Sequence, residues 1–214
     1  MRQISLIVYD FDGTLVDTLF DITDSVNLTL ADLSLPKLPR ETIRKYVGKG
    51  VERLMSQTLE GSSFTDIPQA VAIFKKNYSE NLVNHTDFYP HGREILEHFK
   101  NKKQAICSNK PEDFVRRILN SLNRLHSFDA IIGGDSVNSK KPDPEGLISI
   151  LEKLNVSADE AVLIGDSPVD VETGKRAGVY TCVANFGLGF PEEIAIANPD
   201  SSIDCLSKLK EMFC

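Results

Sequence analysis

The stretch IVYDFDGT, residues 7–14, constrains this chain most, because a short apolar run ends on two acids. Among residues 4–8 only Ser5 is polar, which is typical of a buried strand. An Asp-Gly pair can form a hairpin turn, but the apolar residues that follow have the spacing of a helix. Asp10 and Asp12 therefore join a strand to a helix, where open α/β sheets bind ligands. Two acids at such a join suggest a metal ion or a phosphoryl group.

Strand-like and helical segments alternate along the rest of the chain. We expect strands at 4–9, 104–107, 130–132, 161–164 and 179–183, with helices at 111–122, 144–154 and 169–177 between the later ones. This alternation predicts a parallel sheet covered by helices on both faces, with right-handed crossovers. The expected fold class is therefore α/β, with a Rossmann-like parallel sheet as its core.

A long segment separates the first two predicted strands. It contains predicted helices at 17–33, 40–47, 51–59 and 66–82, and a helix at 94–100 that belongs to the core. An insertion at this point leaves and re-enters the core beside Asp10 and Asp12. We therefore expect residues 16–88 to form a helical cap domain over these acids, and residues 1–15 and 89–214 to form the core domain.

Composition and charge limit the classes of partner. Hydrophobic residues make up 41% of the chain and charged residues 26%, as in ordinary globular proteins. The formal net charge of −7 argues against nucleic acid, whose binding depends on Lys and Arg. No apolar run approaches the ~20 residues of a membrane helix, so we expect no membrane partner. The cysteines are scattered, without a CxxC pair, which indicates a reducing, cytoplasmic setting.

Three more strand ends carry polar side chains that could join the first two acids. In chain order they are Ser108 and Asn109, then Lys141, then Asp166 and Asp170. Each has an ordinary explanation by itself, as a helix cap, a surface charge, a turn residue or an acid in a first helical turn. Together they favour one site, since several acids in a cleft repel one another unless a cation binds. Mg²⁺ suits such oxygen ligands.

These segments resemble the four motifs of the haloacid dehalogenase (HAD) superfamily, in that family's order. Residues 10–14 (DFDGT) resemble its first motif, Ser108 its second, Lys141 its third and residues 165–170 (GDSPVD) its fourth. The insertion resembles the family's small helical C1-type cap. Within it, residues 47–50 (VGKG) resemble a loop of phosphoglycolate phosphatases, although Lys49 stands where a small polar residue is expected. The resemblance implies a phosphatase that acts on a small phosphorylated metabolite.

The first two acids are expected to carry the chemistry. Unaided hydrolysis of phosphate monoesters is extremely slow, and a covalent intermediate divides the reaction into easier steps. We assign Asp10 as the nucleophile that forms an aspartyl-phosphate, as the resemblance also implies. Asp12 then protonates the leaving oxygen and later takes a proton from water. Dehalogenases of the superfamily lack an acid at the position of Asp12, which favours phosphoryl transfer.

The remaining residues are expected to hold the metal and the phosphoryl group. The expected Mg²⁺ ligands are Asp10 and Asp166, with Asp12 through its backbone carbonyl, as the family implies. Asp170 either supports the metal through a water or orients Lys141. We expect Lys141 to neutralise negative charge on Asp10 and on the phosphoryl oxygens. Ser108 and the amides near Phe11, Asp12 and Asn109 are expected to donate hydrogen bonds to the phosphoryl group. Gly13 is expected to allow a sharp turn, and the Thr14 hydroxyl either supports that turn or faces the phosphate.

Two cap cations, Arg44 and Lys49, lie near the 48–50 loop. They are either solvated surface charges or contacts for a second negative charge on the substrate.

We expect 2-phosphoglycolate as the substrate. The alternatives are a HAD phosphatase acting on a sugar phosphate, a nucleotide or pyrophosphate, a β-phosphoglucomutase-like isomerase, and a non-catalytic binding protein. A monomer and a homodimer formed through the cap both remain open.

Overall fold

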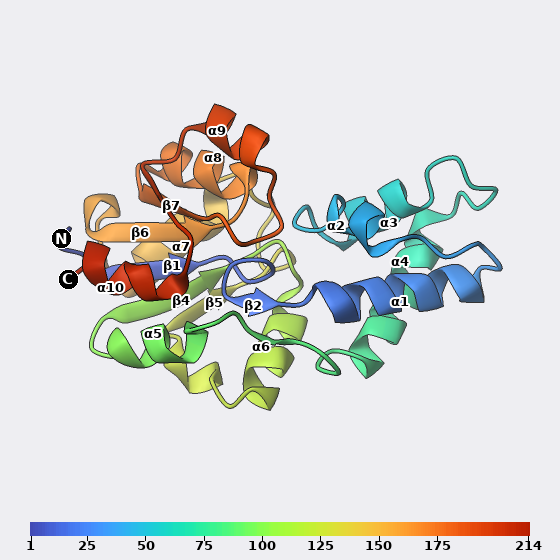
Figure 1. The fold of residues 1–214 in the computed structure, drawn as a ribbon, viewed down its shortest axis with the longest axis horizontal. Coiled ribbons are helices and arrows are strands. Elements are labelled where there is room, and N and C mark those ends of the chain that lie inside the picture. Colours follow the sequence, from blue (N-terminus) through green and yellow to red (C-terminus); the bar gives the residue numbers. More distant parts are fainter.

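The core of the protein is a parallel sheet in a computed structural model that describes residues 1–214 (Figure 1). The strands lie in the order β5-β4-β1-β6-β7-β8, and every neighbouring pair is parallel. The predicted α/β class is confirmed. Their bounds are Leu6–Tyr9 (β1), Lys103–Cys107 (β4), Ala130–Ile132 (β5), Ala161–Gly165 (β6), Tyr180–Ala184 (β7) and Ser201–Ile203 (β8).

The first strand lies inside the sheet, between β4 and β6. The chain builds outward from β1 on one side through β4 and β5, and on the other side through β6, β7 and β8. The carboxyl end of β1 is therefore the point where the strand order reverses, which is where open α/β sheets bind their ligands.

Helices cover both faces of this sheet, and the side chains of β1 alternate between them. Leu6 and Val8 belong to one hydrophobic cluster, whereas Ile7 and Tyr9 belong to another. Because both faces are buried, the strand is apolar at every position. The core helices are α5 (Gly92–His98), α6 (Glu112–Ser121), α7 (Glu145–Leu154), α8 (Pro168–Ala177), α9 (Pro191–Ala197) and α10 (Leu209–Met212).

A helical region is inserted between β1 and β4, through two short strands. β2 (Val16–Asp17) and β3 (Asp87–Phe88) pair in antiparallel fashion, so the outgoing and returning chains lie side by side. This region forms a separate body beside the carboxyl ends of the core strands (Figure 1). Its helices are α1 (Leu19–Asp32), α2 (Arg40–Arg44), α3 (Val51–Thr58) and α4 (Ile67–Glu80).

Several elements lack a clear sequence signal. The sequence analysis did not predict β2, β3, β8, α9 or α10, which are short and have few apolar residues in a regular pattern. The helix expected at 40–47 ends at Arg44, and the chain turns through residues 45–48.

No helix is both long enough and apolar enough to span a membrane.

Candidate active site

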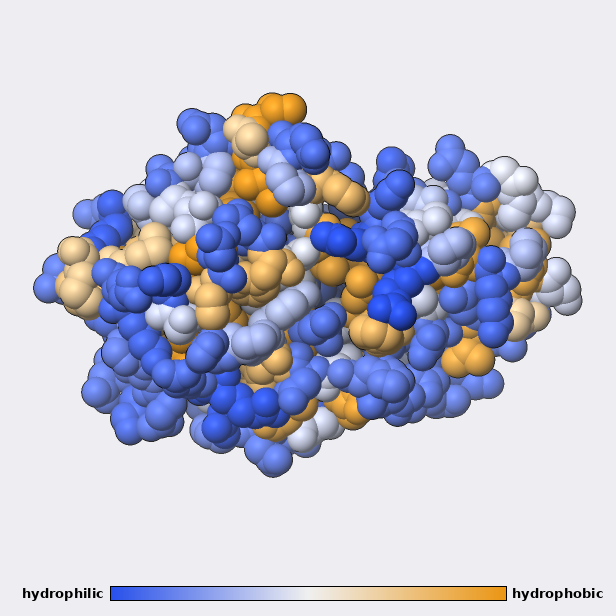
Figure 2. Space-filling model, viewed as in Figure 1, coloured by the Kyte–Doolittle hydropathy of each residue, from blue (hydrophilic) through white to orange (hydrophobic).

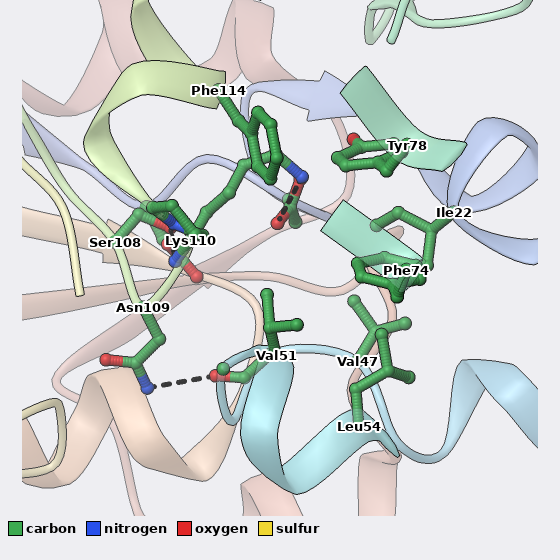
Figure 3. Close-up of a pocket in the computed structure, with 15 residues that line it drawn as sticks. Ile22, Val47, Val51, Leu54, Phe74, Tyr78, Ser108, Asn109, Lys110 and Phe114 are labelled. Atoms are coloured by element: carbon green, nitrogen blue, oxygen red, sulfur yellow. Dashed lines mark hydrogen bonds and ion pairs between the residues drawn. The ribbon is translucent and has the colours of Figure 1, made fainter. Parts of the chain in front are cut away.

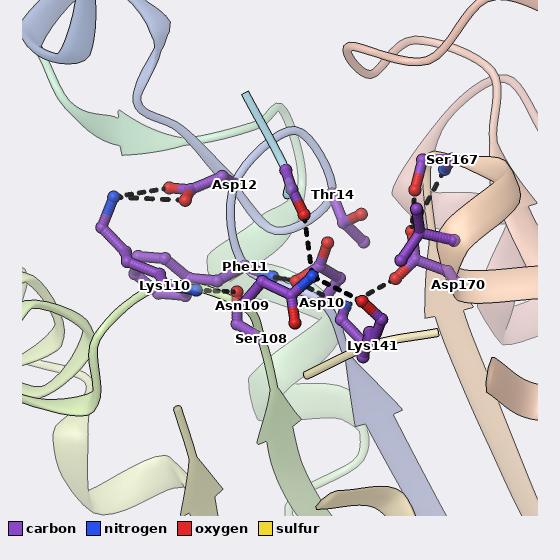
Figure 4. Close-up of polar contacts among 12 residues, drawn as sticks. Asp10, Phe11, Asp12, Thr14, Ser108, Asn109, Lys110, Lys141, Ser167 and Asp170 are labelled. Atoms are coloured by element: carbon purple, nitrogen blue, oxygen red, sulfur yellow. Dashed lines mark hydrogen bonds and ion pairs between the residues drawn. The ribbon is translucent and has the colours of Figure 1, made fainter. Parts of the chain in front are cut away.

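The carboxyl ends of β1, β4 and β6 bring most of the predicted site residues together (Figure 4). Asp10 follows β1, Ser108 follows β4 and Asp166 follows β6. The loop after β5 adds Lys141, whose ammonium lies 2.9 Å from Asp10 Oδ1 and 2.6 Å from Asp170 Oδ1. Side chains that are far apart in the sequence therefore share one buried network of charges.

Asp10, Asp166 and Asp170 form a cluster of buried carboxylates, each with an oxygen within 4.8 Å of the others. Burial, with the nearby charges of Asp170 and Asp10, raises the pKa of Asp166 to about 8. Burial also raises the pKa of Asp10 to about 6, although Lys141 opposes this shift. Acids whose ionisation is opposed in this way are stabilised by a cation. Their oxygen donors suit a hard divalent ion.

The turn after β1 holds Asp166 in place. Thr14 Oγ1 donates a hydrogen bond to Asp166 Oδ1 over 3.1 Å, and the Leu188 amide donates to Asp166 Oδ2 over 2.6 Å. Gly13 has a φ of +86°, and a Cβ there would lie 2.4 Å from Asp166 Oδ2. Glycine is therefore required here, both for the left-handed backbone conformation and for the close approach of the acid.

Asp170 lies in the first turn of α8, and both of its carboxylate oxygens have partners. Oδ1 contacts Lys141, while Oδ2 accepts hydrogen bonds from the Ser167 hydroxyl at 2.6 Å and the Ser167 amide at 3.1 Å. Ser167 and Asp170 thus form a capping box. Asp170 therefore caps the start of α8 and contacts Lys141 at the same time.

The Asp12 carboxylate is not part of the three-acid cluster. Its Oδ1 accepts a hydrogen bond from Thr18 Oγ1 at 2.6 Å, and the Lys110 ammonium lies 3.0 and 3.2 Å from its two oxygens. Lys110 is buried, and burial lowers its pKa whereas Asp12 opposes that shift. The sequence analysis missed Lys110. Its position directly after Ser108 and Asn109 was the available signal.

The residues that follow β4 and β1 form hydrogen bonds within the site and to the inserted region. Asn109 Nδ2 donates to the Gly48 carbonyl of the inserted region and to the Lys141 carbonyl, both over 3.0 Å. Ser108 Oγ accepts a hydrogen bond from the Lys110 amide at 3.4 Å. The Phe11 amide donates to Asp10 Oδ1 over 2.7 Å, and its side chain is in the core. Asn109 thereby connects the core site to the 48–50 loop.

The two predicted cap cations have different surroundings. The Arg44 guanidinium donates to the Gly187 carbonyl at 3.1 Å and the Leu188 carbonyl at 3.3 Å, so it connects the inserted region to a core loop. Lys49 is exposed and makes no ion pair, and it lines the larger of two cavities beside the acids. Arg44 is thus engaged by the protein, whereas Lys49 faces an open cavity.

Two cavities lie between the core and the inserted helices, and Asp10 and Asp12 line both. The larger has a volume of about 250 Å³ and reaches Lys49, Asp166 and Phe190. Figure 2 shows a notch between the two bodies, where hydrophilic and hydrophobic residues both reach the surface. The smaller cavity has a volume of about 40 Å³ and largely apolar walls (Figure 3). The acids therefore face one larger cavity with mostly polar lining residues and one smaller cavity with largely apolar walls.

A family model described as haloacid dehalogenase-like hydrolase matches residues 7–184. The chain belongs to this family. This HAD-like hydrolase is 39% identical over 184 residues to the phosphoglycolate phosphatase of Aquifex aeolicus (strain VF5), covering 85% of each protein. It is 35% identical over 214 residues to that of Psychrobacter arcticus, covering 95% of this chain and 93% of the relative.

Solved structures support the same family. The crystal structure of a predicted phosphoglycolate phosphatase from Haemophilus somnus 129pt matches with a TM-score of 0.94 and 28% identity, covering 99% of both chains. The resemblance to the HAD superfamily, and the parallel-sheet fold with an inserted helical region that it implied, are therefore confirmed.

Proposed function

We propose that this HAD-like hydrolase is a Mg²⁺-dependent phosphatase that hydrolyses a small phosphate monoester, with 2-phosphoglycolate as its preferred substrate. One observation carries the proposal: Asp10 belongs to a buried carboxylate cluster, while Asp12 is held apart from it by Lys110. The two acids therefore have separate environments suited to separate roles. The names of relatives at 39% and 35% identity support the choice of substrate.

The first step is attack by Asp10. Its carboxylate oxygen forms a bond to phosphorus while the bond from phosphorus to the ester oxygen breaks, giving an aspartyl-phosphate. Lys141, 2.9 Å from Asp10 Oδ1, balances negative charge on Asp10 and on the phosphoryl oxygens. Ser108 and the amides of Asp12 and Asn109 donate hydrogen bonds to the phosphoryl group, and such fixed donors are a large part of catalysis.

Asp12 transfers the protons in both steps. It donates a proton to the ester oxygen as that oxygen leaves, which releases an alcohol. It then accepts a proton from a water that attacks phosphorus, and the bond from phosphorus to Asp10 breaks to release phosphate. The contacts of Asp12 with Thr18 and Lys110 keep its carboxylate beside the cavities and away from the acid cluster.

The carboxylates of Asp10 and Asp166, with the backbone carbonyl of Asp12, would hold the Mg²⁺ ion. When bound, the ion would neutralise the acids and stabilise charge on the phosphoryl group. We assign Asp170 a positioning role, because Lys141 and Ser167 already occupy its two oxygens. Thr14 likewise positions Asp166.

The inserted region acts as the cap in this proposal. We divide the chain into a cap of residues 16–88 and a core of residues 1–15 and 89–214, because β2 and β3 mark the two crossings. Arg44 contacts the core loop, and Lys49 attracts the anionic substrate to the larger cavity. All these residues come from one chain, so the proposal holds for a monomer or a homodimer. A cytoplasmic setting follows from the scattered cysteines.

Phosphate release with Mg²⁺ tests this function. The assay compares 2-phosphoglycolate with glucose 6-phosphate, AMP, pyrophosphate and β-glucose 1-phosphate. We expect kcat/KM for 2-phosphoglycolate to be higher by tenfold or more, which corresponds to about 1.4 kcal/mol. A different best substrate would overturn the substrate assignment and keep the phosphatase. Isomerisation of β-glucose 1-phosphate, or no turnover of any ester with Mg²⁺, would overturn the phosphatase itself.

A further inference from the structure

The smaller cavity contains polar groups with unused capacity for hydrogen bonds. Tyr78 is 1% exposed, and its buried hydroxyl has no hydrogen-bond partner. The Lys110 ammonium has three N–H donors, and Asp12 provides its only acceptors. Its other close neighbour is the Tyr78 ring, whose centroid lies 4.5 Å from Nζ. Buried donors without acceptors cost free energy, so a ligand that supplies acceptors would bind favourably here.

The two donors come from the two bodies that line the cavity. Tyr78 belongs to α4 of the inserted region, whereas Lys110 belongs to the core loop after β4. Figure 3 shows them beside Phe114 at one end of the cavity. The remaining walls are mostly apolar and include Ile22, Val47, Val51, Leu54 and Phe74.

We propose that the Lys110 ammonium and the Tyr78 hydroxyl bind a carboxylate on the leaving group, and thereby select a phosphate ester that carries this second charge. This inference rests on the proposed function and names the residues that distinguish its substrate from neutral esters. Lys110 also contacts Asp12, so one ammonium serves both the acid that protonates the ester oxygen and the carboxylate that identifies the substrate.

The distances support this dual contact. A proton passes from Asp12 to the ester oxygen only if the two lie within about 3 Å. In 2-phosphoglycolate a single CH₂ group joins the ester oxygen to the carboxylate, so the carboxylate oxygens lie about 3 Å from the ester oxygen. Lys110 Nζ is 3.0 and 3.2 Å from the Asp12 oxygens. An ammonium at that position can contact the carboxylate of a substrate bound at Asp12 when the CH₂ group directs the carboxylate toward Lys110.

The size and lining of the cavity favour a small anion. A site of about 40 Å³ has room for only a few heavy atoms, since one water needs about 10–15 Å³. Such a space suits a carboxylate better than a hexose or a nucleoside. The two predicted cap cations are less suited to this role, because Arg44 donates to core carbonyls and Lys49 is exposed. A carboxylate bound by Lys110 and Tyr78 would also hold the inserted region against the core while the ester reacts.

A pair of nearly isosteric substrates tests the inference. In 2-hydroxyethyl phosphate a neutral CH₂OH group replaces the carboxylate of 2-phosphoglycolate. We expect Lys110→Met to lower kcat/KM for 2-phosphoglycolate about 100-fold more than for 2-hydroxyethyl phosphate. Tyr78→Phe, which removes only the hydroxyl, should reduce the same ratio about tenfold. Lys110→Arg should restore part of the ratio. Lys76→Met, at an exposed position on the same cap helix, should leave it unchanged.

Equal losses on both substrates in Lys110→Met would overturn the inference, because Lys110 would then act only through Asp12. If Tyr78→Phe leaves the ratio of kcat/KM values for the two substrates unchanged, the Tyr78 hydroxyl does not bind the carboxylate. Glycolate inhibition gives a second readout: the wild type should bind glycolate more tightly than Tyr78→Phe does, even if Lys110→Met does not fold. The proposed function is decided separately, by the ranking of substrates in the wild type, so the two can fail independently.

Discussion

Thr14 Oγ1 donates a hydrogen bond to Asp166 Oδ1 over 3.1 Å, which connects the turn after β1 to the end of β6. Thr14→Val removes this donor while it keeps the shape of the side chain. Residues that orient metal ligands commonly contribute tenfold or more to metal affinity. We therefore expect Mg²⁺ affinity, measured by calorimetry, to fall roughly tenfold. Thr14→Ser retains the hydroxyl and is the matched control; an equal loss in both variants would contradict this explanation.

Asp12→Asn separates binding from proton transfer. The amide keeps the size of the side chain but cannot donate or accept the required proton. We expect phosphate to bind with about the same affinity while turnover falls by at least about 100-fold. Asp10→Asn should abolish turnover entirely, since it lacks the nucleophile. Full activity in either variant, measured by phosphate release, would remove the assigned role from that residue.

Asp170→Asn tests whether this acid positions Lys141 or holds the metal. The substitution removes the negative charge that lies 2.6 Å from Lys141 Nζ. We expect kcat to fall about 100-fold, because Lys141 is no longer held beside Asp10, while Mg²⁺ affinity changes little. Asp166→Asn is the comparison, and it should lose most Mg²⁺ binding. A loss of Mg²⁺ affinity as large in Asp170→Asn would show that Asp170 ligates the metal directly.

The pKa shifts predict how Mg²⁺ binding depends on pH. Burial raises the pKa of Asp10 to about 6 and that of Asp166 to about 8, whereas unfolded aspartates titrate near ~3.9. At pH values between the unfolded and the folded pKa, the metal-free folded protein binds more protons than the unfolded chain. Its free energy of unfolding therefore falls as pH rises through this range. Mg²⁺ needs the ionised acids. The increase in Tm at a fixed Mg²⁺ concentration should therefore grow between about pH 5.5 and 8.5.

Two results would contradict that pH prediction. One is an Mg²⁺-induced shift in Tm that is constant over this pH range. The other is a shift that persists in Asp166→Asn, which should show little Mg²⁺ stabilisation at any pH. Release of protons on Mg²⁺ addition to a weakly buffered solution near neutral pH provides an independent check.

Lys49→Ala tests the attraction of substrate to the larger cavity. Lys49 is exposed and makes no ion pair, so it acts through the local electrostatic potential. We expect kcat/KM for 2-phosphoglycolate to fall a few-fold at low salt, and the difference to shrink as salt screens the charge. Lys76→Ala, on an exposed face of α4, is the control. If Lys49→Ala changes kcat/KM for no substrate, Lys49 is a solvated surface charge.

The sequence predicted much of the site because apolar strands can be recognised locally, and the residues that follow parallel strands lie along one edge of the sheet. Asp10, Ser108 and Asp166 each directly follow an apolar strand. Parallel strands end at one edge of their sheet, and β4, β1 and β6 are neighbours, so these residues meet. The long helical segment between the first two predicted strands likewise indicated the insertion. For Asp170 the sequence left open a place in a first helical turn, a contact with Lys141 and a metal-bound water, and the structure contains the first two together.

Lys110 and Tyr78 show what sequence could not provide. Lys110 directly follows Ser108 and Asn109, but its partner cannot be read from that position, and Tyr78 has the spacing of an ordinary core residue of α4. Only the packing of the inserted helices against the core buries both and brings the ammonium to 4.5 Å from the ring centroid. The same is true of Arg44, which two carbonyls of a distant loop engage.

By itself, then, the sequence determined which strand ends carry the acids, the lysine and the hydroxyl, because alternation and helical spacing are local properties of the chain. The tertiary structure decided the partner of each charge: Asp12 pairs with Lys110, whereas Asp10 and Asp170 share Lys141. The physical reason is that burial depends on residues far apart in the chain. The strength of a charge contact depends on how completely those residues exclude water.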